Sequence, residues 1–265
     1  MLELSRTVRF CLSGDADDFA TPRDNTFSAW PAMRGLGRYY ELDVTCRGEA
    51  DPQTGYFINI KQIDQAVREC VLPLLLERLN GETRSADLPM GALMLDVLGA
   101  LGPPLSESAV SATLVLTPTL SLTAIKDDMH HVLLRQQYEF SAAHRLHVPS
   151  LSDEENRQVF GKCNNPAGHG HNYRVEVAVR CPVDTQGQAL APAALDAAVD
   201  EHCIQKLDHK HLNTDVPQFA ELNPSVENIV KVVWSMLEGK LPGDAELDEV
   251  KVWETGKTVC AYRGD

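Results

Sequence analysis

The sequence predicts an α+β protein made of two tandem units, residues 1–128 and 129–265. Three observations predict this fold class: segments whose apolar residues alternate at period two, segments with apolar stripes at helical spacing, and an order of segments that occurs twice. At roughly 150 residues per domain, a chain of 265 residues is one large domain or two small ones. The internal repeat favours two.

The two copies of the repeat are only weakly similar in each segment, but the matching segments occur in the same order. VRFCLSG (8–14) aligns with YEFSAAH (138–144), and GLGRYYELDVTC (35–46) aligns with GHGHNYRVEVAV (168–179). A glycine turn and a helical stretch follow in both copies, so that Asp64 aligns with Asp196. A second helical pattern comes next in each copy, at 89–101 and at 224–236. This shared order indicates a tandem duplication.

The elements of the second unit follow from local patterns. Alternating faces predict strands over 137–146 and 169–179, with a long loop between them. Pro192 suits the first turn of a helix, and Ser225 suits the N-cap of a second helix. We expect two further strands, at 249–254 and 258–262, to complete the sheet.

Composition excludes several classes of protein. The 38 acidic residues outnumber the 24 basic ones, and a net charge of -14 argues against a nucleic-acid binder, which presents a basic patch. No stretch approaches the ~18 apolar residues of a membrane span, and MLELSRTVRF lacks the layout of a secretory signal. Seven cysteines without a CxxC pair predict reduced thiols. We therefore expect a cytoplasmic protein.

All nine histidines lie at or after His130, which directs attention to the second unit. His169 and His171 are two residues apart on a predicted strand, so both rings leave the same face, and His144 lies on the apolar face of the other strand. Three imidazoles of this kind form a tetrahedral zinc site whose fourth position is open, the arrangement of catalytic zinc. Strand histidines with a purely structural role are the alternative.

Cys163 lies in a predicted loop, six residues before His169. It is a candidate nucleophile or base, an inert thiol, or a zinc ligand in a Cys-His-His set. Asp208 and His209 are adjacent, and a carboxylate beside an imidazole fixes its tautomer and raises its basicity. A solvated helix end is the other interpretation of this pair.

Glu254 shares a strand face with Val250 and Val252, so a carboxylate ends an apolar face. Such a carboxylate needs a partner. The partner is either the paired N–H donors of a pterin or guanine edge, or a Lys or Arg of the protein.

Taken together, the segments FSAAHRL, SDEEN, FGKCNNPAGHGHNY, LDHKHLN, PSVEN and VKVWET resemble the 6-pyruvoyl-tetrahydropterin synthase family over about residues 136–264. This family includes 6-carboxy-tetrahydropterin synthases. The resemblance implies the tunnelling fold, in which four antiparallel strands carry two helices on one face and subunits assemble into barrels. Val226 departs from the threonine that is frequent in the pyruvoyl-forming members.

The resemblance also implies the roles of individual residues. His144, His169 and His171 would bind zinc, and Cys163 would be the catalytic thiolate, with Asp208 and His209 completing a triad shared between subunits. Glu254 would anchor the pterin ring, and Glu227 would support substrate binding. The expected reaction is loss of triphosphate from 7,8-dihydroneopterin triphosphate to give 6-pyruvoyl-tetrahydropterin. The alternatives are a 6-carboxy-tetrahydropterin synthase of queuosine biosynthesis and a non-catalytic pterin-binding or scaffold protein. Cations expected near the triphosphate are Arg145, Lys162 and Lys210.

The first unit lacks these residues in the internal alignment. Gly14, Leu36 and Arg38 stand at the positions of the three histidines, Trp30 at that of Cys163, Ala92 at that of Glu227, and Leu116 near that of Glu254. We therefore expect a unit that keeps the fold and has lost the chemistry. Three such chains would supply six units, which predicts a homotrimer that resembles a hexamer.

Overall fold

The computed structural model describes residues 1–12, 24–25, 30–31, 38–81 and 87–264. These residues form two compact units. Unit 1 contains Met1–Leu134 and Cys181–Ala189, and unit 2 contains Arg135–Arg180 and Leu190–Asp265. No helix among the described residues is both long and apolar enough to cross a membrane.

The sheet of unit 1 is antiparallel, with β1 (Leu2–Leu12), β4 (Arg38–Gly48), β5 (Ala109–Thr117) and β6 (Leu120–Ile125) side by side in that order. Its register pairs Val8 with Leu42, and Leu42 in turn with Leu114. Because side chains alternate along a strand, these apolar residues share one face and are buried there. A short ribbon, β2 (Asp24–Asn25) with β3 (Trp30–Pro31), lies outside this sheet.

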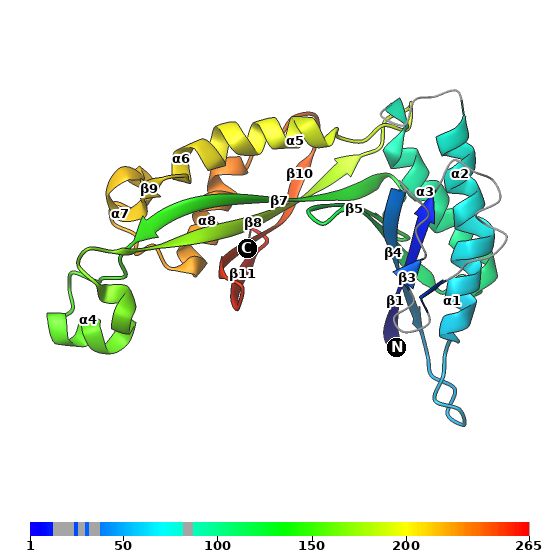
Figure 1. The fold of residues 1–265 in the computed structure, drawn as a ribbon, viewed down its shortest axis with the longest axis horizontal. Coiled ribbons are helices and arrows are strands. Elements are labelled where there is room, and N and C mark those ends of the chain that lie inside the picture. Colours follow the sequence, from blue (N-terminus) through cyan, green and yellow to red (C-terminus); the bar gives the residue numbers. More distant parts are fainter. Residues whose placement is uncertain (13–23, 26–29, 32–37, 82–86, 265) are drawn as a thin grey trace. The chain divides into compact units, whose positions relative to one another are not determined.

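Helices cover the apolar face of the unit 1 sheet (Figure 1). They are α1 (Ile60–Ala66), which runs through the π-helical turn Val67–Val71 into α2 (Leu72–Asn80), and α3 (Met90–Leu101). Asn59 begins α1 with a capping box in which its side chain and that of Gln62 each bond the other's backbone. Asp64 of α1 forms a bidentate ion pair with Arg6 of β1, with both N···O distances 2.9 Å.

Unit 2 contains β7 (His131–His144), β8 (His169–Pro182), β10 (Glu246–Thr255) and β11 (Thr258–Tyr262), again in that order. The first residues of β7 and the last of β8 belong to unit 1. β10 is antiparallel to β8 and to β11, and the short strand β9 (Lys210–His211) runs parallel to β7. The predicted strands are therefore present, with β7 beginning earlier than expected and ending at His144.

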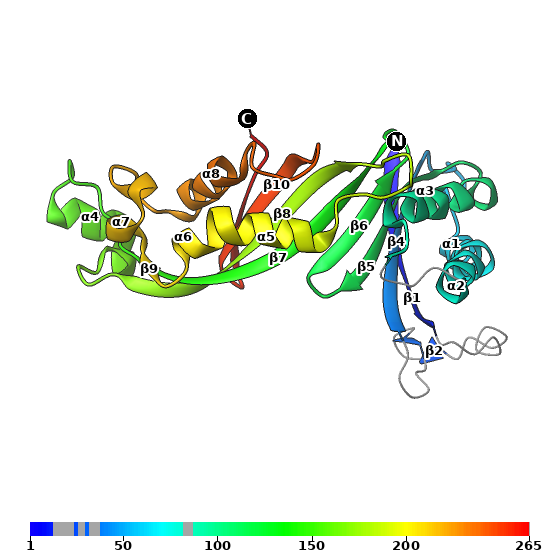
Figure 2. The same cartoon turned by 90° about the horizontal axis from the view of Figure 1, so that it is seen from above.

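Two helical segments pack on this sheet (Figure 2). The first is α5 (Pro192–Val199), continued by the π-helical turn Asp200–Ile204 and by α6 (Gln205–Leu207), and the second is α8 (Val226–Leu237). Pro192 stands in the first turn of α5, as expected. Ser225 stands at the N-cap of α8, but its side chain bonds the Glu227 carboxylate and makes no capping bond to the backbone. Tyr138 of β7 donates to Asp196 of α5 over 3.0 Å.

The segment between β7 and β8 differs from the expected loop. It contains α4 (Asp153–Phe160), which begins with a capping box between Ser152 and Glu155. A 3₁₀ turn, Gly161–Asn164, follows α4 directly. Short α7 (Leu212–Asp215) follows β9. The α+β class is confirmed.

Candidate active site

The imidazoles of His144, His169 and His171 form one cluster. His144 ends β7, and the other two begin β8 on its inner, helix-covered face. His144 Nε2 lies 3.0 Å from His169 Nε2, and the three rings each offer a nitrogen within 4.8 Å of the others. Sequence reasoning placed these rings on matching faces, and the fold brings them together.

His144 is held in one tautomer. Its Nδ1 lies 2.7 Å from the carbonyl oxygen of Pro224, just before α8, and because a carbonyl only accepts, Nδ1 carries the proton. The Nε2 lone pair therefore faces the cluster. The ring is 0% exposed, and burial lowers the pKa of His144 to about 4. The uncharged ring is the form that binds a metal ion.

Two nitrogens of the cluster lack hydrogen bonds. Within the described residues, His169 Nδ1 and His171 Nε2 are buried and have no hydrogen-bond partner. A buried polar atom without a partner costs roughly 1–3 kcal/mol, which coordination of a metal by His171 Nε2 would offset. Three imidazoles converging in this way fit a zinc ion with an open fourth position.

Glu254 extends from β10 to the same cluster. Its Oε1 lies 3.4 Å from His144 Nε2 and 3.8 Å from His171 Nε2, and the side chain is 20% exposed. Among the described residues, no Lys or Arg forms an ion pair with Glu254. The alternative that a Lys or Arg of the protein is its partner is therefore not supported within one chain. A carboxylate beside the cluster is available to a ligand with paired N–H donors.

Tyr173 is a residue of the candidate site that the sequence analysis did not single out. Its ring stacks on Phe140 at 4.9 Å and meets His171 edge-on at 5.5 Å. The hydroxyl is buried without a partner within the described residues, and burial raises the pKa of Tyr173, with Glu254 and Cys163 adding to the effect. Its position two residues after His171, on the same strand face, was the available signal.

Cys163 lies in the 3₁₀ turn Gly161–Asn164 and is half-buried. Gly161 reverses the chain between α4 and this turn with φ +54°, a conformation that glycine adopts readily and other residues do not. The Cys163 carbonyl accepts a hydrogen bond from the Leu146 backbone over 2.9 Å. The thiol is thus carried on a tightly anchored turn rather than on an open loop.

Asp208 and His209 form a hydrogen-bonded pair. Asp208 Oδ2 lies 2.7 Å from His209 Nδ1, and Oδ1 accepts from the Ser141 backbone over 2.8 Å. These bonds, the Ser141 bond first, lower the pKa of Asp208. Because a carboxylate oxygen accepts, His209 Nδ1 donates in this bond and Nε2 is the ring nitrogen outside it. His209 has a φ of +55°, and its side chain is 83% exposed.

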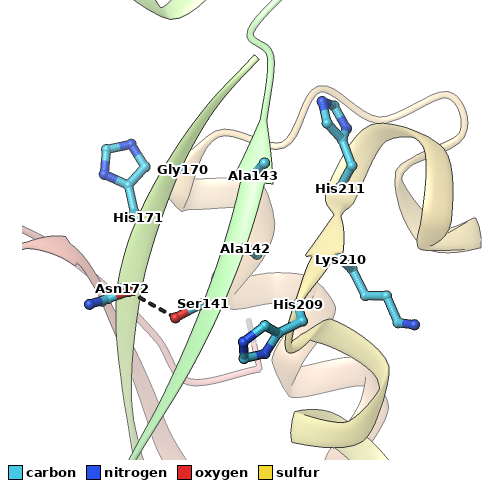
Figure 3. Close-up of a pocket in the computed structure, with 9 residues that line it drawn as sticks. All are labelled: Ser141, Ala142, Ala143, Gly170, His171, Asn172, His209, Lys210 and His211. Carbon is cyan, nitrogen blue, oxygen red and sulfur yellow. Dashed lines mark hydrogen bonds between the residues drawn. The ribbon is translucent and has the colours of Figure 1, made fainter. Parts of the chain in front are cut away.

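His209 borders an open cavity of about 620 Å³ on β7, β8 and β9 (Figure 3). The His171 ring extends from β8 away from the segment that carries His209 (Figure 3). In the described part of the chain, no hydrogen bond, ion pair or ring contact joins Cys163 to Asp208 or His209. Within the described residues, one chain therefore assembles the histidine cluster with Glu254 and makes no contact between Cys163 and the Asp208–His209 pair.

The remaining predicted residues lie around this region. Glu227 is exposed in the first turn of α8, where the Ser225 hydroxyl lowers the pKa of Glu227. Arg145 and Lys162 line a second cavity near Cys163, whereas Lys210 lines the cavity of His209. The three cations expected near the triphosphate therefore line two different cavities, and their role stays a prediction.

A family model described as 6-pyruvoyl tetrahydropterin synthase matches residues 133–265. The chain belongs to this family. Proteins named 6-pyruvoyl tetrahydrobiopterin synthase from Drosophila melanogaster and Homo sapiens are 46% and 44% identical to it over 132 and 131 residues. These matches cover 49% of this chain and, respectively, 79% and 90% of the relatives.

A solved structure of Caenorhabditis elegans 6-pyruvoyl tetrahydropterin synthase is 36% identical to this chain, with a TM-score of 0.48. The match covers 51% of this chain and 96% of the Caenorhabditis elegans chain. The part matched by the 6-pyruvoyl tetrahydropterin synthase model contains the histidine cluster, Cys163 and the Asp208–His209 pair. Residues 1–132 lie outside the match.

Proposed function

We propose that the chain is a metal-dependent lyase that converts 7,8-dihydroneopterin triphosphate to 6-pyruvoyl-tetrahydropterin with loss of triphosphate. The observation that carries this proposal is the convergence of three histidines and Glu254 inside the part of the chain that the family model matches. The substrate and the product follow from membership of the family.

His144, His169 and His171 would hold the metal, and their three nitrogens with an open fourth position favour zinc. Zinc bound there would supply Lewis acidity, which polarises the side-chain hydroxyls of the substrate and acidifies the adjacent C–H. Glu254, beside the cluster, would accept the paired N–H donors of the pterin ring, as a carboxylate accepts two parallel donors. Glu227 would have a supporting role at the start of α8.

Cys163 and His209 would move the protons. The thiolate of Cys163 would remove a proton from carbon, and His209, oriented by Asp208, would give or take a proton through Nε2. Because His209 is exposed and no contact joins it to Cys163 within the described chain, we propose that neighbouring chains complete the triad.

The tandem arrangement, with a non-catalytic unit at 1–128 and a catalytic unit at 129–265, is part of this proposal. In both units, the four strands of the sheet and the two helical segments that pack on it follow the same order along the chain: two strands, two helical segments, two strands. In both, a π-helical turn follows the first of these helices. Asp64 and Asp196, aligned in the sequence, each bond the first strand of their unit, through Arg6 and Tyr138. A common ancestor for both units explains these parallels.

The first unit would have lost the chemistry. Gly14 and Leu36, aligned with His144 and His169, lie outside the described residues, as does the side chain of Trp30. Arg38, aligned with His171, is exposed at the start of β4, and Ala92 and Leu116 carry no ionisable group.

A homotrimer of two-unit chains would supply six units and the neighbours that the triad needs. We propose the cytoplasm as its location, since no disulfide joins any of the seven cysteines.

Product identification tests the proposed function. Incubation with 7,8-dihydroneopterin triphosphate and analysis by mass spectrometry should yield 6-pyruvoyl-tetrahydropterin and free tripolyphosphate. Acetaldehyde with a carboxylated pterin would instead identify a 6-carboxy-tetrahydropterin synthase, and binding without turnover would identify a pterin-binding protein. Either result would overturn the proposal.

A further inference from the structure

A second cavity near Cys163 is lined mainly by positive charge. Its volume is about 580 Å³, and it is lined by Arg145, which directly follows β7, by α4, and by the turn that holds Cys163 with the two residues after it. The charged residues in its lining are Arg145, Arg157, Lys162 and Asp153. Three cations thus face one carboxylate in a chain whose net charge is -14, so the cavity has the opposite charge to the chain as a whole.

Arg145 is fixed in place before any ligand binds. Its Nε donates to the Asn164 carbonyl over 3.2 Å, and its backbone N–H and C=O exchange hydrogen bonds of 2.8 and 3.0 Å with the Asn213 side chain. Preorganisation of this kind lowers the entropy lost on binding. The rigid fork of a guanidinium matches the oxygens of a phosphate group.

Two of the cations lack a protein counter-charge. Among the described residues, no carboxylate forms an ion pair with Arg145 or Lys162, whereas Arg157 is exposed and lies 3.7 Å from Glu154. The cavity therefore presents two cations without an ion pair among the described residues and a third that is partly neutralised by Glu154. An anion with several charges is the ligand that this arrangement favours.

We propose that this cavity binds a linear polyphosphate, the triphosphate of the substrate, through Arg145 and Lys162. The proposal rests on the proposed function, which supplies a substrate with a triphosphate leaving group. When its C–O bond breaks, the electron pair leaves on the triphosphate oxygen, and the added charge would face Arg145 and Lys162. Lys162 directly precedes Cys163, so the cavity holds the leaving group close to the thiol that would take the proton.

The test measures the affinity for inorganic tripolyphosphate by titration calorimetry on the metal-loaded full chain. Lys162 is exposed, so Lys162→Gln is the variant of choice. We expect its tripolyphosphate affinity to fall about tenfold or more, the loss of one charge-assisted contact, while its affinity for phosphate-free dihydroneopterin stays unchanged.

Lys240→Gln is the matched control. Lys240 is exposed beyond the end of α8, whose 12 residues separate it from Ser225 by about 18 Å, and it does not line the cavity. This control should bind tripolyphosphate as the wild type does. Equal affinity in wild type and Lys162→Gln, or an equal loss in both variants, would overturn the proposal.

The same experiment separates this proposal from the proposed function. If wild type binds tripolyphosphate through Lys162 but makes no product from dihydroneopterin triphosphate, the polyphosphate cavity is supported and the proposed function fails. If wild type makes the product and Lys162→Gln keeps both its KM and its tripolyphosphate affinity, the proposed function stands and the cavity proposal is wrong.

Discussion

At the scale of single residues, the candidate site depends on how two imidazole protons are held. The Pro224 carbonyl holds the Nδ1 proton of His144, and the Asp208 carboxylate holds that of His209. In both rings Nε2 is left with its lone pair, one aimed at the histidine cluster and one at solvent. A hydrogen bond at Nδ1 thus orients both rings, as the proposed roles of His144 as a metal ligand and of His209 as a proton acceptor require.

Asp208→Asn tests the second of these roles. The amide keeps the size of the side chain but can donate to His209 Nδ1, which would favour the wrong tautomer. We expect kcat to fall by roughly 10²–10⁴-fold with a much smaller change in KM. Steady-state kinetics measure this, with exposed Asp244→Asn as the control. An unchanged kcat would remove Asp208 and His209 from the mechanism.

The burial of His144 predicts a pH dependence of the metal-free protein. The folded pKa of about 4 lies below the ordinary value of ~6.5, so between these values the unfolded chain binds more protons than the folded one. The free energy of unfolding should therefore fall as pH decreases from about 6.5 to 4, by up to about 3 kcal/mol. Urea unfolding of chelated protein at several pH values measures this. His144→Gln should show a smaller pH dependence, and an equal dependence would contradict the assignment.

Some residue-scale features could be predicted and others could not. His169 and His171 could be placed on one face because side chains alternate along a strand, which is a local rule that needs only the sequence. The bond from His144 to Pro224 spans 80 positions and depends on where α8 docks, which no local pattern encodes. The contact of Glu254 with the histidines likewise requires the register of β10 on β8.

At the scale of elements, the segment between β7 and β8 contains a helix-start signal that the sequence analysis did not use. SDEEN contains the Ser152 and Glu155 of a capping box, which predicts a helix start, and α4 does begin there. Expecting only a loop between β7 and β8 was therefore an avoidable error. The two π-helical turns could not be anticipated, because their extra residue reflects packing rather than propensity.

The docking of α3 gives an element-scale prediction with an internal control. A Cβ at Gly91 would lie 2.9 Å from the Gly187 carbonyl oxygen and from Val183, whereas a Cβ at Gly99 of the same helix meets nothing within 4 Å. We expect Gly91→Ala to destabilise the protein by about 1–3 kcal/mol through overpacking. Gly99→Ala should stabilise it by up to about 1 kcal/mol, because alanine favours the helix. Denaturant unfolding compares them, and equal effects would contradict the close packing at Gly91.

At the scale of the whole molecule, the candidate catalytic residues all lie in one part of the chain. The histidine cluster, Cys163 and the Asp208–His209 pair all come from the part that the family model matches, after residue 132. The part before His130 has 11 basic and 18 acidic residues and the rest has 13 and 20, so their equal net charge gave no hint of this difference, whereas the absence of histidine before His130 did. The sequence could indicate which half contains the candidate catalytic residues. It could not show that, within the described residues of one chain, Cys163 makes no contact with the Asp208–His209 pair.

Sharing of the triad between chains predicts complementation. Cys163→Ala and His209→Ala should each be inactive alone, because each removes one proton-transfer group. Mixed, dissociated and reassembled, the two variants should regain a fraction of wild-type activity, since some interfaces then pair an intact Cys163 with an intact His209. Light scattering should give the mass of three chains. A mixture that stays inactive, or an active monomer, would contradict a shared triad.

The central claim is that one metal centre per chain supports the lyase reaction, and a zinc titration of the chelated protein tests it most directly. Two quantities are followed together: the product formed from 7,8-dihydroneopterin triphosphate, and the bound zinc, which mass spectrometry measures. Because only the second unit has the three histidines, both should rise and level off at one equivalent of zinc per 265-residue chain. Full activity of the metal-free protein, or a plateau at two equivalents, would contradict the account.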